Sequence, residues 1–435
     1  MVVPPEFLKS LTKRLGVSEG ELQVLLDTLE GEDLSAIAQR LGVQRNALQK
    51  RLGEVYKKFQ IEGAGPGKFA KLQKIILEEY QKQINDLQKE AEKQTTDHLD
   101  WGDAPVVGTF CGRTMQLTTL ENDLIKERCP LVGLLGMAGI GKSAIAVRLI
   151  ESVADNYDYV IWRNLSLRGV PHLDNLLRDL MACFRHSQEI ETNDNHPPLI
   201  ADLIEEFRAS RCLVILDNFE SVFQANNLAS YYQGGYENYG DLLKQVAQTR
   251  HQSSILLLSR ETPLELITLA GDQLPTRFMT LNGLTVETVK EILAKKGINI
   301  ADKNLLSRLT QDYSGHPIAI NELVTTAQTL FDGNFDELLD SNPLFIGEIL
   351  SRYFSEQFQR LSPLEKQVMT HLAASNSGLT LKEIQHNLSD INDLSYVMTA
   401  LSSLNRRCLL QKQTNQKITR FTLIPTLKKY VSSQG

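Results

Sequence analysis

The residues best suited to chemistry form the segment Gly136-Met-Ala-Gly-Ile-Gly-Lys-Ser143. An apolar run, Leu131–Leu135, precedes it and a helical pattern follows, so a strand, a glycine-rich loop and a helix are expected in this order. The glycines permit backbone conformations in which amide N–H groups converge on phosphate oxygens, and the helix N-terminus adds positive potential. The segment therefore predicts a phosphate site in which Lys142 meets the β- and γ-phosphates and Ser143 binds Mg²⁺.

The nucleotide contacts expected from this loop are Gly136, Met137, Ala138, Gly139, Ile140, Gly141, Lys142, Ser143 and Ala144.

A carboxylate that could hold the metal follows another apolar run, Cys212–Asp217. Asp217 is therefore the second expected Mg²⁺ ligand, beside Ser143. The next residue is Asn218, whose amide cannot take a proton from water, so a general base directly after the metal acid is missing and Glu220 is the candidate substitute. If Glu220 cannot act, the site would bind and exchange nucleotide while hydrolysing it slowly, so the chain is at most a slow NTPase.

Arg260 is a third candidate functional residue, and it follows the apolar run Ile255–Leu258 and Ser259. Open α/β sheets collect their ligands at the carboxyl ends of their strands. Arg260 is expected to contact the γ-phosphate, with a strand-end salt bridge as the alternative. The candidate catalytic residues are thus Asp217, Glu220 and Arg260.

These strands belong to an alternation of short apolar runs and helical stretches, which is typical of an α/β fold with a parallel sheet covered by helices. The length of 435 residues allows about three domains. The expected divisions are a helical module at 1–66, a long amphipathic helix and linker at 67–105, a nucleotide-binding domain at 106–280, a helical subdomain at 281–355 and a winged-helix subdomain at 356–435. The long helix would serve either as a coiled-coil stalk or as part of the core of its own domain.

Composition sets the broad class. No apolar run is long enough to span a membrane and the start lacks a secretory signal, so a cytoplasmic protein without a membrane partner is expected. The five cysteines show neither disulfide nor zinc spacing. The net charge is −7, yet residues 40–74 hold nine Lys or Arg against two Glu. This local basic segment is compatible with a nucleic-acid partner.

The motifs together resemble the NB-ARC branch of the STAND ATPases over residues 106–430. The matching segments are Phe110-Cys-Gly-Arg113, Tyr159–Arg163, the phosphate loop, LVILDNFE, LLLSRETP and Ser314–Ile320. The resemblance implies ADP/ATP as cofactor with Mg²⁺, and nucleotide exchange that drives homo-oligomerisation. It also implies that Arg113 lies near the base, that Pro317 packs against adenine and that Arg260 is a sensor.

Three departures from that family stand out. Ile424 occupies the position of a family histidine that touches the β-phosphate of ADP, which puts an ADP-locked resting state in doubt. His316 replaces an apolar residue and is expected to be a surface histidine. Relatives usually continue into repeat domains that sense a ligand, so either a separate sensor protein is needed or the sequence is part of a longer chain.

Residues 16–75 resemble the LuxR-type helix-turn-helix, with 44–59 as its recognition helix in a major groove. The phosphate-contact candidates are Arg45, Lys50, Arg51, Lys57, Lys58 and Lys68. Where the family has a Thr-Val-Lys core, this chain has Ala47-Leu48-Gln49, which weakens both phosphate anchoring and base reading. A helical adaptor that binds protein is the alternative.

The resulting hypothesis is a STAND-type signal-transduction switch whose output is double-stranded DNA binding and transcription control. Two alternatives remain open. One is a defence or stress scaffold that recruits a protein effector, and the other is an AAA+-like ATPase that remodels nucleic acid.

Overall fold

The computed structural model describes residues 5–29, 34–61, 67–69, 71–76, 79, 98–184, 199–271, 274–300, 302–341, 344–388, 393–415 and 418–434. The chain divides into two compact units, Met1–Asp97 and His98–Gly435. Within the described ranges, no helix is both long and apolar enough to cross a bilayer. All five cysteines are free, as their spacing predicted.

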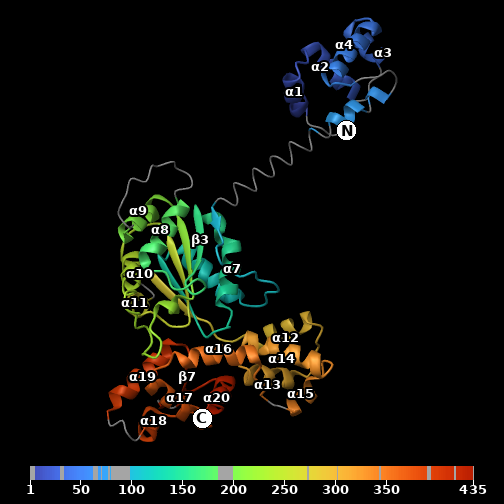
Figure 1. Ribbon diagram of the computed structural model, residues 1–435. Coiled ribbons are helices and arrows are strands. Elements are labelled where there is room, and N and C mark those ends of the chain that lie inside the picture. Colours follow the sequence, from blue (N-terminus) through green and yellow to red (C-terminus); the bar gives the residue numbers. More distant parts are fainter. Residues whose placement is uncertain are drawn as a thin grey trace. The chain divides into compact units, whose positions relative to one another are not determined.

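The first unit is helical (Figure 1). Its helices are α1 (Pro5–Arg14), α2 (Glu19–Leu29), α3 (Leu34–Leu41) and α4 (Arg45–Lys58). The spacing of Leu48, Leu52 and Val55 places them on one face of α4, where they are buried. The predicted long helix lies mostly outside the described residues, but Leu72 and Ile76 are buried in the same core as Val55. These two residues therefore pack within their own domain.

The second unit contains a six-stranded parallel sheet with the order β1-β3-β4-β5-β2-β6. Its strands are β1 (Leu99–Asp100), β2 (Leu131–Leu135), β3 (Tyr159–Asn164), β4 (Cys212–Asp217), β5 (Ser254–Ser259) and β6 (Thr276–Thr280). The helices that accompany them are α6 (Thr114–Glu121), α7 (Lys142–Val153), α8 (Leu173–Phe184), α9 (Ile200–Ala209), α10 (Asn238–Gln248) and α11 (Leu264–Leu269). Short turns of other helical types are η1 (Asn122–Lys126), η2 (Ala154–Asn156) and η4 (Phe219–Val222). The predicted α/β core with a parallel sheet is confirmed.

Strands β2, β4 and β5 are buried on both faces, which explains why they are almost continuously apolar. On β4, Val214 and Leu216 face a cluster that includes residues of α8, α9 and α10. Leu213 and Ile215 face the opposite cluster, which includes residues of α7. The strands therefore hold a fixed register, and Leu135 of β2 lies opposite Ser259 of β5. The polar residues at the strand ends consequently lie at one edge of the sheet.

The sheet begins earlier than the sequence suggested. Residues up to 105 were expected to form a linker, but Leu99 and Asp100 pair with Val160 and Ile161 of β3. The compact unit therefore includes residues from His98 onward. A strand of two residues has too little hydrophobic pattern to be recognised without its partner.

The rest of the second unit is mainly helical. It contains α12 (Val286–Lys295), α13 (Lys303–Asp312), α14 (Pro317–Leu330), α15 (Phe335–Ser341), α16 (Glu348–Gln359), α17 (Pro363–Ala374), α18 (Leu381–Asn387), α19 (Leu394–Arg406) and α20 (Pro425–Ser432). An antiparallel hairpin joins β7 (Gln411–Asn415) to β8 (Ile418–Thr422) between α19 and α20. The helical part and the C-terminal part, in which a winged helix was expected, share one hydrophobic core, to which Met137 of the glycine-rich loop also belongs. They therefore pack as one body.

Substitution of Ile215 by Ala tests the central strand. The side chain is fully buried, so its loss should leave a cavity and lower the free energy of unfolding by about 2–5 kcal/mol. Urea denaturation followed by circular dichroism measures this change. Ile418→Ala is the control, because that side chain is 56% exposed, and it should cost less than about 1 kcal/mol. Equal losses would contradict the assigned core.

Candidate nucleotide-binding site

The glycine-rich loop connects β2 to α7 and is shaped by three residues with positive φ. Gly136, Gly139 and Gly141 have φ values of 150°, 71° and 102°, which residues with a side chain rarely adopt. The Lys142 Nζ donates hydrogen bonds to the carbonyls of Gly136 at 2.8 Å and Met137 at 3.0 Å. An ammonium has three N–H groups, so one remains for a phosphate. Burial lowers the pKa of Lys142 to about 8.

The expected metal ligands lie side by side at the start of α7 and the end of β4. The Ser143 hydroxyl donates to the Asp217 carboxylate at 2.9 Å. Burial raises the pKa of Asp217, although the Ser143 hydrogen bond opposes that effect. Within the described part of the chain, no cluster of three His, Cys, Asp or Glu could hold a metal. A hydroxyl and one carboxylate nonetheless fit Mg²⁺, which typically binds one or two carboxylates and completes its shell with phosphates and water.

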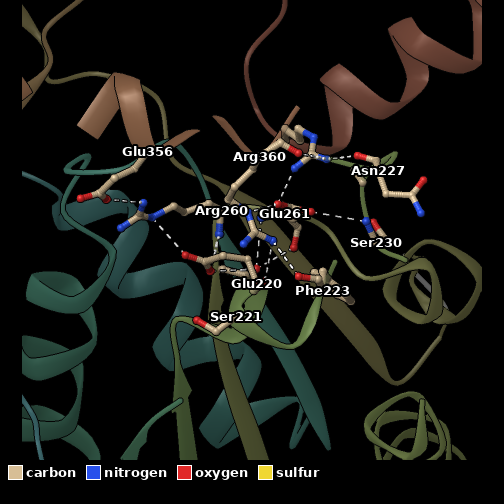
Figure 2. Close-up of polar contacts among 12 residues, drawn as sticks. Glu220, Ser221, Phe223, Asn227, Ser230, Arg260, Glu261, Glu356 and Arg360 are labelled. Atoms are coloured by element: carbon tan, nitrogen blue, oxygen red, sulfur yellow. Dashed lines mark hydrogen bonds and ion pairs between the residues drawn. The ribbon is translucent and has the colours of Figure 1, made fainter. Parts of the chain in front are cut away.

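Glu220 and Arg260 form an ion pair (Figure 2). The Glu220 Oε1 lies 3.0 Å from the Arg260 Nε. Its Oε2 accepts hydrogen bonds from the Arg260 backbone N–H at 3.0 Å and from the Ser259 hydroxyl at 3.3 Å. Both carboxylate oxygens are therefore engaged.

Arg113, which the family resemblance predicts to lie near the base, is beside the loop. It adopts a left-handed conformation with φ 65° just before α6 and donates from Nη2 to the Ile140 carbonyl at 3.2 Å. Burial lowers its pKa. Pro317 occupies the first turn of α14, a position that its missing N–H and restricted φ favour. Both residues come from outside the strand, loop and helix that form the phosphate loop.

His316 was expected at the surface, but it is 1% exposed. Its Nε2 lies 2.9 Å from the Ala138 carbonyl, and because a carbonyl only accepts, Nε2 carries the proton. Its Nδ1 has no hydrogen-bond partner among the described residues. Burial lowers the pKa of His316 to about 4. The sequence pattern missed this contact because residues 138 and 316 meet only when α14 packs against the loop.

A cavity of about 640 Å³ opens next to the loop, a volume within the usual range for small-molecule sites. Its walls include Met137 and Ile140 of the loop, His316 of the helical part, and Cys408 and Ile424 of the C-terminal part. Ile424 is 8% exposed. The position where the resembled family has a histidine thus contributes an apolar wall.

The basic candidates of the first unit differ in their surroundings. Arg45, Lys50 and Arg51 are exposed on α4. Lys57 pairs with Glu54 at 2.7 Å, and Lys58 pairs with Glu21 of α2 at 2.6 Å, which holds the pKa of Glu21 below its usual value. The Lys68 Nζ lies 5.8 Å from the centre of the Tyr56 ring. Lys58 therefore links two helices of the module.

Comparison with known proteins agrees with this geometry. Residues 113–261 match the family model described as the NB-ARC domain, and these residues contain the loop, Asp217 and Arg260. The core of this chain therefore has a P-loop NTPase fold. A Walker-type ATPase of Pyrococcus abyssi has the same fold, with a TM-score of 0.52 and 15% identity over 74% of this chain and 96% of that one.

Two further similarities extend over most of the chain. An uncharacterized WD repeat-containing protein of Nostoc sp. is 35% identical over 346 residues, which cover 77% of this chain and 27% of the relative. The chain thus spans about a quarter of that relative's length. The structure of Drosophila ORC bound to DNA includes a chain that aligns with 76% of this chain over 88% of its own length, at 12% identity and a TM-score of 0.38.

The buried His316 predicts a specific pH dependence. Unfolding restores its pKa from about 4 to about 6.5, so the unfolded state takes up a proton that the folded state excludes. Stability should therefore fall as the pH drops through 6.5, by about 2 kcal/mol from this residue between pH 7 and pH 5.

Urea denaturation at both pH values measures this effect. His316→Gln should reduce the loss of stability between pH 7 and pH 5 by that amount. His386→Gln, at an exposed position of α18, is the matched control and should leave the loss unchanged. An identical pH dependence in wild type and His316→Gln would contradict the burial of a neutral imidazole.

Proposed function

We propose that this P-loop NTPase is an ADP/ATP-dependent switch in signal transduction. The observation that carries this proposal is the arrangement of Lys142, which retains one N–H for a phosphate, beside the Ser143–Asp217 pair. Such a site would hold the terminal phosphates through Lys142 and the loop amides, and Mg²⁺ through Ser143 and Asp217. When bound, Mg²⁺ would neutralise phosphate charge. Arg113 and Pro317 would lie near the base, and Arg260 would meet the γ-phosphate.

Slow hydrolysis fits this site better than rapid turnover. Asn218 follows the metal acid, and Glu220 is engaged by Arg260 and Ser259. A general base must reach the attacking water. The residence time of ATP would therefore be long, which suits a two-state regulator.

The contact between the core and the winged helix supports a conformational response. Glu261, which follows Arg260, is buried and pairs with Arg360 and Arg407. The Thr262 N–H donates to the Arg406 carbonyl at 2.9 Å. Nucleotide exchange beside these residues would alter the docking of the winged helix and so permit self-association.

The bound nucleotide provides the direct test. Purified protein should release ADP or ATP on denaturation, detected by ion-exchange chromatography. Lys142→Ala should weaken nucleotide affinity about 10–100-fold, because it removes charged hydrogen bonds to phosphate, and should abolish nucleotide-dependent oligomers in light scattering. Lys290→Ala, exposed on α12, is the control. Unchanged affinity in Lys142→Ala would refute the site.

DNA binding is the output that we propose for the first unit. The observation that favours it is the cluster of Arg45, Lys50 and Arg51, which are exposed on α4 while Leu48, Leu52 and Val55 are buried. A helix with a basic exposed face suits a major groove. The rival output is recruitment of a protein effector by the same face.

A gel-shift salt series separates these outputs. Duplex affinity should fall with salt, and each of Arg45→Ala, Lys50→Ala and Arg51→Ala should reduce the slope of log affinity against log salt by about one. Lys9 is exposed on α1, and Lys9→Ala is the control that should leave this slope unchanged. Absence of duplex binding at low salt would exclude the DNA output and favour the protein effector.

A further inference from the structure

One face of α16 contacts both Arg260 and the segment that carries Glu220. Tyr353, Glu356 and Arg360 are spaced by three and four residues, so they share that face. The Glu356 Oε2 lies 3.5 Å from the Arg260 Nη1, and the Arg260 guanidinium lies 5.7 Å from the centre of the Tyr353 ring. Figure 2 shows Glu356 and Glu220 on either side of Arg260.

Arg360, at the C-terminal end of the same helix, contacts the turn that carries Glu220. Its Nη2 donates to the backbone carbonyls of Glu220 at 2.9 Å and Phe223 at 3.1 Å. Its Nε donates to the buried carboxylate of Glu261 at 2.9 Å. The end of α16 is thus anchored to the core on both sides of the Arg260–Glu220 pair.

The positive charge of Arg260 is consequently neutralised by carboxylates of the protein itself. Its side chain is 19% exposed, with Glu220 and Glu356 as carboxylate partners. An incoming γ-phosphate would compete with both carboxylates for the same guanidinium. ADP has no γ-phosphate and would leave these contacts intact.

We infer that Tyr353, Glu356 and Arg360 are positioning residues that keep Arg260 paired with Glu220, and thereby set the preference of the site for ADP over ATP. This inference rests on the proposed function. Arg360 holds the Glu220 turn, while Tyr353 and Glu356 hold the Arg260 side chain. Binding of ATP frees Arg260 from α16. This release links the γ-phosphate to the docking of the winged helix.

The test measures the affinities of the full chain for fluorescent ADP and for a fluorescent, slowly hydrolysed ATP analogue, both with Mg²⁺. The Glu356–Arg260 pair is partly exposed, so its loss has a modest effect. Glu356→Gln should raise affinity for the ATP analogue about three- to tenfold and leave ADP affinity unchanged. Tyr353→Leu should act in the same direction. Glu348→Gln, exposed in the first turn of α16, is the matched control and should change neither affinity.

A double-mutant cycle shows whether the effect passes through Arg260. In an Arg260→Ala background, Glu356→Gln should no longer raise affinity for the ATP analogue. Three outcomes would overturn the inference and leave the proposed function standing. Glu356→Gln could change the affinities for ADP and the ATP analogue equally, or leave both unchanged. It could also raise affinity for the ATP analogue by the same factor in the Arg260→Ala background. A wild-type chain that binds neither nucleotide would overturn the proposed function, and the inference with it.

Discussion

The arrangement of the second unit depends on the burial of two carboxylates, Glu261 and Glu365, whose side chains are 3% and 0% exposed. Arg407 lies between them and donates to both, and Arg360 completes the neutralisation of Glu261. A buried charge that loses its partner costs several kcal/mol. Glu261 is therefore neutralised in its buried position by arginines that the C-terminal part supplies.

The residues of this ionic contact are neighbours of the residues proposed for nucleotide chemistry. Arg260 and Glu261 are consecutive at the carboxyl end of β5. Arg260 pairs with Glu220 of the proposed nucleotide site, and Glu261 pairs with Arg407 of the C-terminal part. Neighbouring segments add to the contact, since the Ala229 carbonyl accepts from Arg406 and the Asn227 carbonyl accepts from Arg407. The residue proposed to meet the γ-phosphate is thus one position from the contact with the C-terminal part.

The helical part adds a second contact with the phosphate loop. His316 bonds to the Ala138 carbonyl, and a Cβ at Gly139 would lie 2.4 Å from Ile318. Gly139 is therefore favoured by its backbone conformation, and a side chain there would also displace the end of the Ile318 side chain. Ile424 lines the neighbouring cavity together with Met137 and Ile140 of the loop.

The sequence by itself determined the features encoded in short stretches: the glycine-rich loop, the apolar central strands and Asp217 at the end of β4. Glycine conformations, strand burial and helix periodicity depend on residues that are close in the chain, so their patterns can be recognised without knowledge of the fold. The tertiary structure alone decided which charges meet. Glu261 and Arg407 are 146 positions apart, and His316 lies 178 positions from Ala138. Such pairs leave no local pattern, because their energy arises only when packing removes both groups from water.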